Sequence, residues 1–170
     1  MLYAGFNIND IFYKTWKNQA YNRTHNGGGN VAVDSTHIYL GSSSTYNTYD
    51  SLMLTTPIYI TPSSVLNLRS QLYAMSGCIA TIFITDQPNI SAFTFQSNGH
   101  CSNDDILILA EGLYDSVSVW VTHDFLQQNL QALISSKYTD LTKPYYIGVV
   151  CSNMYGGNYS KCEITELSVG

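Results

Sequence analysis

Apolar and polar residues alternate along much of this chain, which is the pattern of strands that bury one face. In residues 65–72, Leu66, Leu68 and Leu72 occupy alternate positions, and mostly polar residues stand between them. Residues 78–85 follow, rich in β-branched side chains and ended by turn-forming residues. We expect these two segments to pair as a hairpin.

The clearest alternation lies in residues 115–122, where Val117, Val119 and Val121 share one face of an expected strand. Trp120, in the same segment, is expected in the core. Shorter strands are expected at residues 3–8, 11–16, 30–33, 37–41, 51–55, 57–61, 92–96, 105–110, 145–152 and 160–169. Many short strands separated by Gly, Asn, Ser and Pro favour a mainly β protein, a sandwich or a barrel.

One segment has the spacing of a helix. Apolar residues recur along one helical face at Leu126, Leu130, Leu133 and Ile134. Asp124, with Gln127 three residues later, has the form of a capping box. We expect one short helix from about residue 124 to 136, lying across an end or a face of the sheets.

Length and charge narrow the class of protein. The chain has 170 residues, which suits a single domain over residues 1–170. Only 11% are charged and the net charge is -5, which argues against a nucleic-acid partner. Hydroxyl, amide and phenol groups must therefore solvate much of the surface, which suits recognition better than catalysis. No apolar run approaches the roughly 20 residues that cross a bilayer, so no membrane insertion is expected. No signal peptide is visible, so the protein is expected to stay where it was made unless a signal has been lost.

The four cysteines are Cys78, Cys101, Cys151 and Cys162, and they include no Cys-x-x-Cys pair, which argues against a structural zinc site. If residues 156–157, a Gly-Gly pair, centre a hairpin, Cys151 and Cys162 face each other and could form a cross-strand disulfide. We favour the alternative that both are buried thiols in a reducing compartment.

No motif identifies an active site or a cofactor. A Gly-x-Ser-x-Gly elbow is absent, and His123 beside Asp124 is better explained by a helix N-cap. The three glutamates, Glu111, Glu163 and Glu166, could supply a glycosidase carboxylate pair, but their spacing selects none.

Two loop clusters could hold a metal ion, although none is expected. The first is His100, Cys101 and Asp104, with donors suited to zinc, and the second combines Asp34 with Asp104 and Asp105, with donors suited to calcium. A polar turn explains the same residues, and neither spacing is diagnostic.

Aromatic residues near loops are the strongest indication of a binding surface, because exposed rings can stack on sugars while amides bind hydroxyls. The candidate ligand-binding residues are Trp16, Tyr46, Asn47, Tyr49, Tyr155, Asn158 and Tyr159. A wider set of rings near loops and strand ends includes Tyr13, Tyr21, Tyr39 and Tyr73. The alternative is that about half of these tyrosines only cap the sandwich, with their hydroxyls in water.

Five stretches together resemble a known family in their succession of strands. They are Ile-Tyr-Ile-Thr-Pro at 58–62, Val-Leu-Asn-Leu at 65–68, the β-branched run at 79–86, Tyr-Tyr-Ile-Gly-Val at 145–149 and Ile-Thr-Glu-Leu at 164–167. This succession resembles the jelly-roll sandwiches of carbohydrate-binding modules, and similar modules occur in bacteriophage tail, fibre and capsid-accessory proteins. The likeness covers about two thirds of the chain and includes no binding motif, so no ligand residue is carried over. It implies an antiparallel jelly-roll β-sandwich with one short helix near residues 124–136.

The same resemblance implies a non-enzymatic virion protein, such as a phage tail, fibre or capsid decoration, assembled in the host cytoplasm. Its expected partners are other virion subunits or copies of itself, and cell-surface glycan. The alternative is a freestanding carbohydrate-binding module or lectin. A small glycan hydrolase on the same fold is the third reading.

Overall fold

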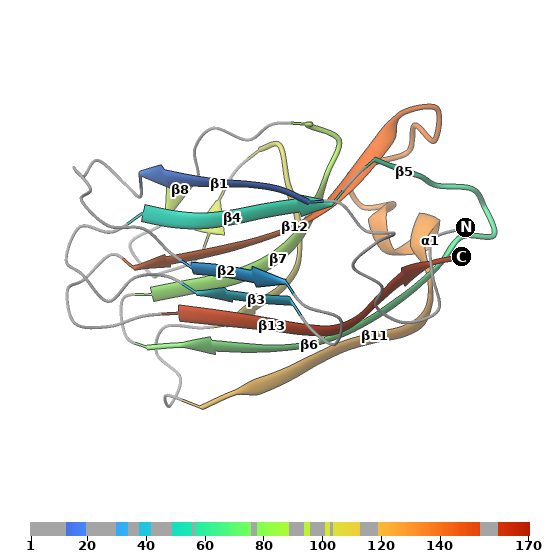
Figure 1. Cartoon of the computed structure of the whole chain (residues 1–170). Helices are drawn as coiled ribbons and strands as arrows, with labels where there is room; N and C mark the ends of the chain where they lie inside the picture. Colours follow the sequence, from blue (N-terminus) through green and yellow to red (C-terminus); the bar gives the residue numbers. More distant parts are fainter. Residues whose placement is uncertain are drawn as a thin grey trace.

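The computed structural model describes residues 13–19, 30–33, 38–41, 49–55, 57–75, 78–88, 94–95, 101–102, 104–112, 119–153 and 160–170. Two antiparallel sheets lie face to face (Figure 1). The first sheet has the order β1 (Tyr13–Gln19), β4 (Tyr49–Thr55), β12 (Pro144–Asn153), β7 (Cys78–Thr85), β10 (Leu107–Gly112), and β5 (Ile58–Tyr59) pairs with the start of β12. The second has the order β11 (Val121–Asn129), β6 (Val65–Ala74), β13 (Ser160–Val169), β3 (Ile38–Gly41), β2 (Asn30–Val33). A separate pair is formed by β8 (Thr94–Phe95) and β9 (Cys101–Ser102), and helix α1 spans Leu130–Ile134.

The strand order is that of a jelly roll. Eight strands are numbered one to eight in chain order: β3, β4, β6, β7, β10, β11, β12 and β13. In four neighbouring pairs the two numbers add up to nine. These neighbours are β3 with β13, β4 with β12, β6 with β11, and β7 with β10. Such pairs arise when one long antiparallel ribbon folds over into two sheets. The expected jelly-roll sandwich is confirmed, with β1 and β2 added at sheet edges.

The core between the sheets follows the alternation in the sequence. Leu66, Leu68 and Leu72 of β6 are completely buried and share one cluster with Ile82 of β7 and Ile147 of β12. Burying each of these aliphatic side chains contributes about 2 kcal/mol. Asn67, Arg69 and Gln71, at the alternate positions of β6, point the other way, to the outer face of the second sheet.

The expected helix over residues 124–136 is mostly a strand. β11 continues to Asn129 as the edge of the second sheet, paired with β6, and α1 covers only Leu130–Ile134 at the end of the sandwich near the C-terminus (Figure 1). Its N-cap is Asn129, whose Oδ1 accepts from Ala132 N at 2.9 Å, so the Asp124 capping box is wrong. Pairing with β6 satisfies the backbone of residues 121–129 more fully than an isolated helical turn would. The prediction that the apolar residues lie on one face of a helix is correct only from Leu130 onward.

The expected hairpin of residues 65–72 with 78–85 is also wrong. The two segments are strands, β6 and β7, but they lie in opposite sheets, and their connection crosses from one layer to the other. The hairpin around residues 156–157 is wrong for the same reason, because β12 and β13 belong to different sheets. Strand alternation fixes which side chains are buried, but it does not fix the neighbour in the sheet.

Three of the four cysteines are thiols. Cys78, Cys151 and Cys162 are buried and form no disulfide. Cys151 lies between Ala80 and Ser51 in the first sheet, whereas Cys162 lies between Leu72 and Leu40 in the second. The favoured alternative of buried thiols is therefore confirmed for Cys151 and Cys162.

The expected strand over residues 115–122 is displaced. β11 begins only at Val121, and residues 113–118 lie outside the described part. Val119, Trp120 and Val121 are 49%, 39% and 41% exposed, so Trp120 is not a core residue as expected. An edge strand has a neighbour on one side only, which leaves both of its faces partly open.

Candidate functional site

The outer faces of the two sheets differ in exposure. On the first sheet, the side chains that point away from the core include Thr81, Phe83, Thr85, Tyr146 and Val150, and none is more than 7% exposed. On the second sheet, the outward side chains of β6, β11 and β13 are exposed or half-buried. Among the described residues, the second sheet therefore offers the open sheet face.

Nine side chains form a regular grid on that face. Strand register aligns them in three rows across β11, β6 and β13, as Trp120, Tyr73 and Lys161, then Thr122, Gln71 and Glu163, then Asp124, Arg69 and Glu166. Trp120 directly precedes β11 and continues its register with β6. Strand spacing and rise give the grid an extent of roughly 10 by 14 Å. We call these nine residues the aromatic–polar face.

The first row is an aromatic platform. The rings of Tyr73 and Trp120 lie with centroids 5.7 Å apart at an interplanar angle of 47°. The Lys161 ammonium lies 5.6 Å from the centroid of the Tyr73 ring, within the range of a cation–π contact. Because Trp120 is 39% exposed, this row keeps an accessible apolar surface in an otherwise polar face.

The third row is an ion-pair network. Arg69 Nε donates to Glu166 Oε2 at 2.9 Å, and its Nη1 lies 3.5 Å from Asp124 Oδ2. A register shift between Ile164 and Glu166 turns Glu166 outward beside Arg69, whereas uninterrupted alternation would turn it inward. The Arg69 side chain is 51% exposed, so these pairs orient the carboxylates more than they stabilise the fold.

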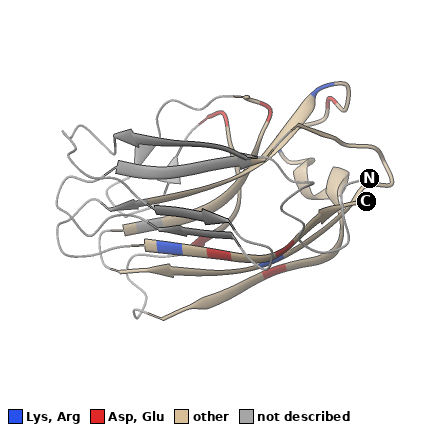
Figure 2. Cartoon of the chain, in the orientation of Figure 1, with Lys and Arg blue, Asp and Glu red and all other residues tan. Residues whose placement is uncertain are grey.

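A cleft of about 200 Å³ opens over the second and third rows. Its lining is polar and consists of Arg69, Ser70, Gln71, Thr122, Asp124, Glu163 and Thr165. These side chains supply amide, hydroxyl, guanidinium and carboxylate groups within one concave surface. Figure 2 shows charged segments of β6, β11 and β13 close together on this sheet. The cleft therefore offers both donors and acceptors beside the aromatic platform.

A second hollow of about 320 Å³ lies at the α1 end, lined by Pro57, Ile58, Tyr59, Thr61, Ser63, Ser64, Val169 and Gly170. Tyr59 is 69% exposed there. The Thr61 hydroxyl lies 3.2 Å from the hydroxyl of Ser63 and 3.2 Å from that of Ser64, so these groups satisfy each other in part. This hollow has one exposed ring and no charged side chain, so it offers fewer groups to a polar ligand than the aromatic–polar face.

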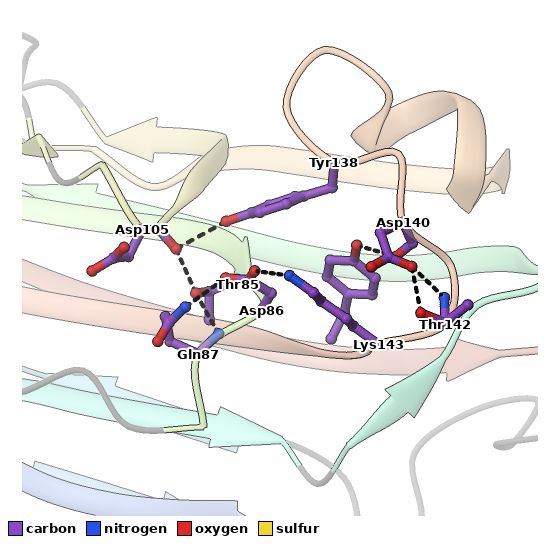
Figure 3. Close-up of polar contacts among 9 residues, drawn as sticks. Thr85, Asp86, Gln87, Asp105, Tyr138, Asp140, Thr142 and Lys143 are labelled. Atoms are coloured by element: carbon purple, nitrogen blue, oxygen red, sulfur yellow. Dashed lines mark hydrogen bonds and ion pairs between the residues drawn. The ribbon is translucent and has the colours of Figure 1, made fainter.

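A polar network near the start of β12 has a structural role (Figure 3). Tyr138, after α1, donates to the carbonyl of Asp105 at 2.9 Å, and Thr85 Oγ1 donates to the same carbonyl. Lys143 Nζ lies 3.7 Å from Asp86 Oδ2. These contacts connect the segment between α1 and β12 to the end of β7 and the turn before β10.

The ionisable groups of this network do not suggest a catalytic pair. Burial, reinforced by the charge of Asp86, raises the pKa of Tyr138 to about 12. Hydrogen bonds from Thr142 lower the pKa of Asp140, which keeps its carboxylate charged. A neutral phenol that donates to a carbonyl and an ionised carboxylate that accepts from a threonine are groups that hold a loop in place.

Two of the sequence-predicted site residues, Trp16 and Tyr49, lie in strands of the first sheet, and the other five fall outside the described part of the chain. Trp16 pairs with Leu52 between β1 and β4, and Tyr49 pairs with Gln19 of the same two strands, so both belong to the first sheet. Their side chains, like all of Tyr46, Asn47, Tyr155, Asn158 and Tyr159, lie outside the described part. Binding by these residues stays a prediction.

The two loop clusters considered as metal sites fall mainly outside the described residues. Asp34 and His100 lie outside them, while Asp104 and Asp105 are exposed. Within the described ranges, no group of three or more His, Cys, Asp or Glu side chains could hold a metal ion. No helix in these ranges is long and apolar enough to cross a membrane.

Sequence reasoning missed Trp120, Lys161 and Glu163 as surface residues. The sequence did indicate that Trp120 faces outward. In an alternating strand it lies on the same side as the polar Thr122 and on the opposite side from Val119 and Val121. Tyr73 likewise continues the polar parity of Arg69 and Gln71. No sequence signal aligns β11, β6 and β13, which are separated by long stretches of chain.

The chain was compared with known proteins. No family model and no curated protein matches it. A family 11 carbohydrate-binding module from Clostridium thermocellum, solved in complex with a β-1,3-1,4-mixed-linked tetrasaccharide, is similar over 92% of this chain and 87% of that one, at 10% identity and a TM-score of 0.43. The family 11 module of the cellulosomal cellulase Lic26A-Cel5E from the same organism is similar over 91% and 87%, at 9% identity and a TM-score of 0.40. The strand pairings, not these distant likenesses, establish the jelly roll.

Proposed function

We propose that the aromatic–polar face binds a glycan and that the protein is a non-catalytic glycan-recognition module. The observation that carries this proposal is the exposed Tyr73–Trp120 pair beside a polar cleft on the open sheet. A sugar ring has an apolar face and a rim of hydroxyls. The aromatic row suits the ring face, and the cleft suits the hydroxyls, because ligand sites combine apolar surface with a few well-placed polar groups.

The sheet itself favours recognition of an extended chain. Rows built on paired strands are rigid, so binding costs little loop ordering. The grid runs about 14 Å along the strands, longer than one sugar ring, so we expect contact with more than one residue of an oligosaccharide.

Hydrolysis is the less favoured reading of the same face. A glycosidase needs two carboxyl groups, one of which donates a proton and one of which attacks or activates water. Asp124 and Glu166 both pair with Arg69, so each already has a partner within the face. Glu163 is the carboxylate of the grid outside this network, and a single carboxylate does not make such a pair.

Affinity electrophoresis through gels containing soluble polysaccharides tests the binding. Wild type should be retarded by at least one member of a panel of mixed-linked β-glucan, xyloglucan, galactomannan and xylan. Trp120→Ala and Tyr73→Ala should each lose about tenfold in affinity, because each removes a stacking surface. Tyr59→Ala is the matched control, since it removes an exposed tyrosine from outside the face.

Two results would contradict the proposal. The first is that no polysaccharide in the panel retards the protein and that no glycan on a wider array gives a response. The second is the release of reducing ends from the bound polysaccharide during long incubation, which would support the hydrolase reading instead.

The virion role, subunit partners, oligomeric state and cytoplasmic localisation expected from the sequence stay predictions. Light scattering over a range of protein concentrations tests self-association, and genes for tail or head proteins beside this one would favour the virion role. Glycan binding is compatible with both the virion and the freestanding reading.

A further inference from the structure

The three carboxylates of the aromatic–polar face differ in their partners. Asp124 and Glu166 both pair with Arg69, and Asp124 Oδ1 also accepts from Ser70 N at 3.2 Å. Glu163 makes no hydrogen bond or ion pair with any described residue. It is the acidic group of the grid whose acceptor capacity is unused.

Glu163 is placed where a ligand would meet it. It is half-buried in β13, faces Gln71 across the register, and forms part of the wall of the 200 Å³ cleft. A partly desolvated carboxylate without a donor is costly, and a ligand donor that reaches it gains a charge-assisted hydrogen bond. A ligand group that donates a hydrogen bond to Glu163 should therefore bind in the cleft better than a group that only accepts one.

The charges around the cleft favour the same kind of ligand. The grid contains Lys161 and Arg69 against Asp124, Glu163 and Glu166, which leaves a net charge of -1. Lys161 lies over the Tyr73 ring at the aromatic row, and Arg69 is already engaged by two carboxylates. An anionic sugar would thus meet an uncompensated carboxylate rather than an available cation.

We propose that Glu163 is a specificity-determining residue that selects donor-rich sugars, with protonated amino sugars bound best, neutral sugars next and carboxylated sugars worst. This inference depends on the proposed glycan binding and concerns only which sugars the face accepts. An ammonium placed at Glu163 completes an ion pair inside the cleft, a pair of hydroxyls gives two hydrogen bonds, and a sugar carboxylate repels it.

Calorimetry with three oligosaccharides on a common β-1,4-linked backbone tests the order. The probes are cello-oligosaccharide, chitosan oligosaccharide and a cello-oligosaccharide oxidised to carry C6 carboxylates, measured at pH 6 and at physiological ionic strength to screen non-specific attraction. We expect wild type to bind the chitosan probe about tenfold more tightly than the neutral probe, and the oxidised probe most weakly.

Two variants separate a contact at Glu163 from a general effect of charge. Glu163→Gln and Asp104→Asn each remove one negative charge, but Asp104 is exposed in the turn before β10 and lies outside the aromatic–polar face. Glu163→Gln should abolish the preference for the amino sugar and weaken the rejection of the oxidised probe. Asp104→Asn should change the ratios by less than about threefold, because an exposed charge outside the face is screened by salt. Thermal unfolding checks that both variants fold.

The outcomes distinguish this inference from the function on which it rests. Suppose that wild type binds the neutral probe in a way that depends on Trp120. If it then shows no preference for the amino sugar, or if Glu163→Gln keeps that preference, the role of Glu163 is overturned and glycan binding stands. Equal effects of the two variants show that net charge alone sets the order, which also overturns it. Failure of wild type to bind any of the three probes or any other glycan overturns both proposals.

Discussion

Tyr73 and Trp120 are 47 residues apart in sequence, yet their rings lie 5.7 Å apart because β6 and β11 pair in antiparallel register. Val121 faces Leu72, so the residues before and after them, Trp120 and Tyr73, meet on the outer side of the sheet. This relationship converts two separate aromatic residues into one platform and identifies the exposed face of the second sheet as the candidate binding surface.

Trp120 should report ligand binding directly. Because it is partly exposed, acrylamide should quench its fluorescence in the free protein, and a bound glycan should protect it. The measurement is the difference between wild type and Trp120→Phe, which removes the Trp120 signal while keeping a ring at the site. Protection of equal size in both proteins would show that the ligand lies elsewhere, near another tryptophan.

The cap of α1 should contribute measurably to stability. Asn129 Oδ1 accepts from Ala132 N at 2.9 Å, and its Nδ2 donates to the carbonyl of Pro62 at 2.9 Å. Asn129→Ala removes both bonds and should cost about 1–2 kcal/mol. For a domain of this size that is a decrease of about 2–8 °C in melting temperature.

Ser136→Ala, an exposed change two residues after α1, is the control and should leave the melting temperature nearly unchanged. If Asn129→Ala had the same melting temperature as wild type, a stabilising cap at Asn129 would be ruled out.

The buried cysteines should resist alkylation in the native protein. Burial raises the pKa of Cys78 to about 12 and also raises the pKa of Cys162, so neither forms a thiolate at neutral pH. Peptide mapping after iodoacetamide treatment should show Cys78, Cys151 and Cys162 unmodified without denaturant and fully modified in guanidinium without reductant. A requirement for reductant would reveal a disulfide.

Acid should destabilise the fold partly through His123. Burial lowers the pKa of this residue in the folded state, although the charge of Asp124 opposes the shift. Above the ordinary pKa of 6.5 both states are neutral, so the stabilising contribution is fully present. As the pH falls toward the lower folded pKa, the unfolded chain binds the proton first and stability is lost.

The check is the melting temperature of wild type and His123→Gln between pH 7.5 and 5. The melting temperature of wild type should fall more on acidification than that of the variant. Parallel decreases in the two proteins would show that His123 makes no contribution and that other groups cause the acid sensitivity.

Alternation predicted most of the strands, because a strand with one buried face must place its apolar residues at every second position. Residues 65–72 and 160–169 show this well, since their buried positions follow the predicted parity until the register shift near Thr165. The helix was misplaced because Leu126, Leu130 and Ile134 fit a helical face as well as they fit an edge strand that leads into one turn of helix. Local pattern alone does not separate these cases when an edge strand is partly open on both sides.

The sequence by itself determined a mainly β fold, the buried leucines of β6, and a surface poor in charge, because these depend on local periodicity and composition. Only the tertiary structure decided which strands are neighbours, that β6 and β7 belong to opposite sheets, and that the outward side chains of β7 and β12 in the first sheet are buried while most of those of β6, β11 and β13 in the second are exposed or half-buried. The row of Trp120, Tyr73 and Lys161 and the unpaired Glu163 follow from that arrangement. The packing of the whole core selects which distant segments pair, and the sequence of a single strand does not specify its neighbour in the sheet.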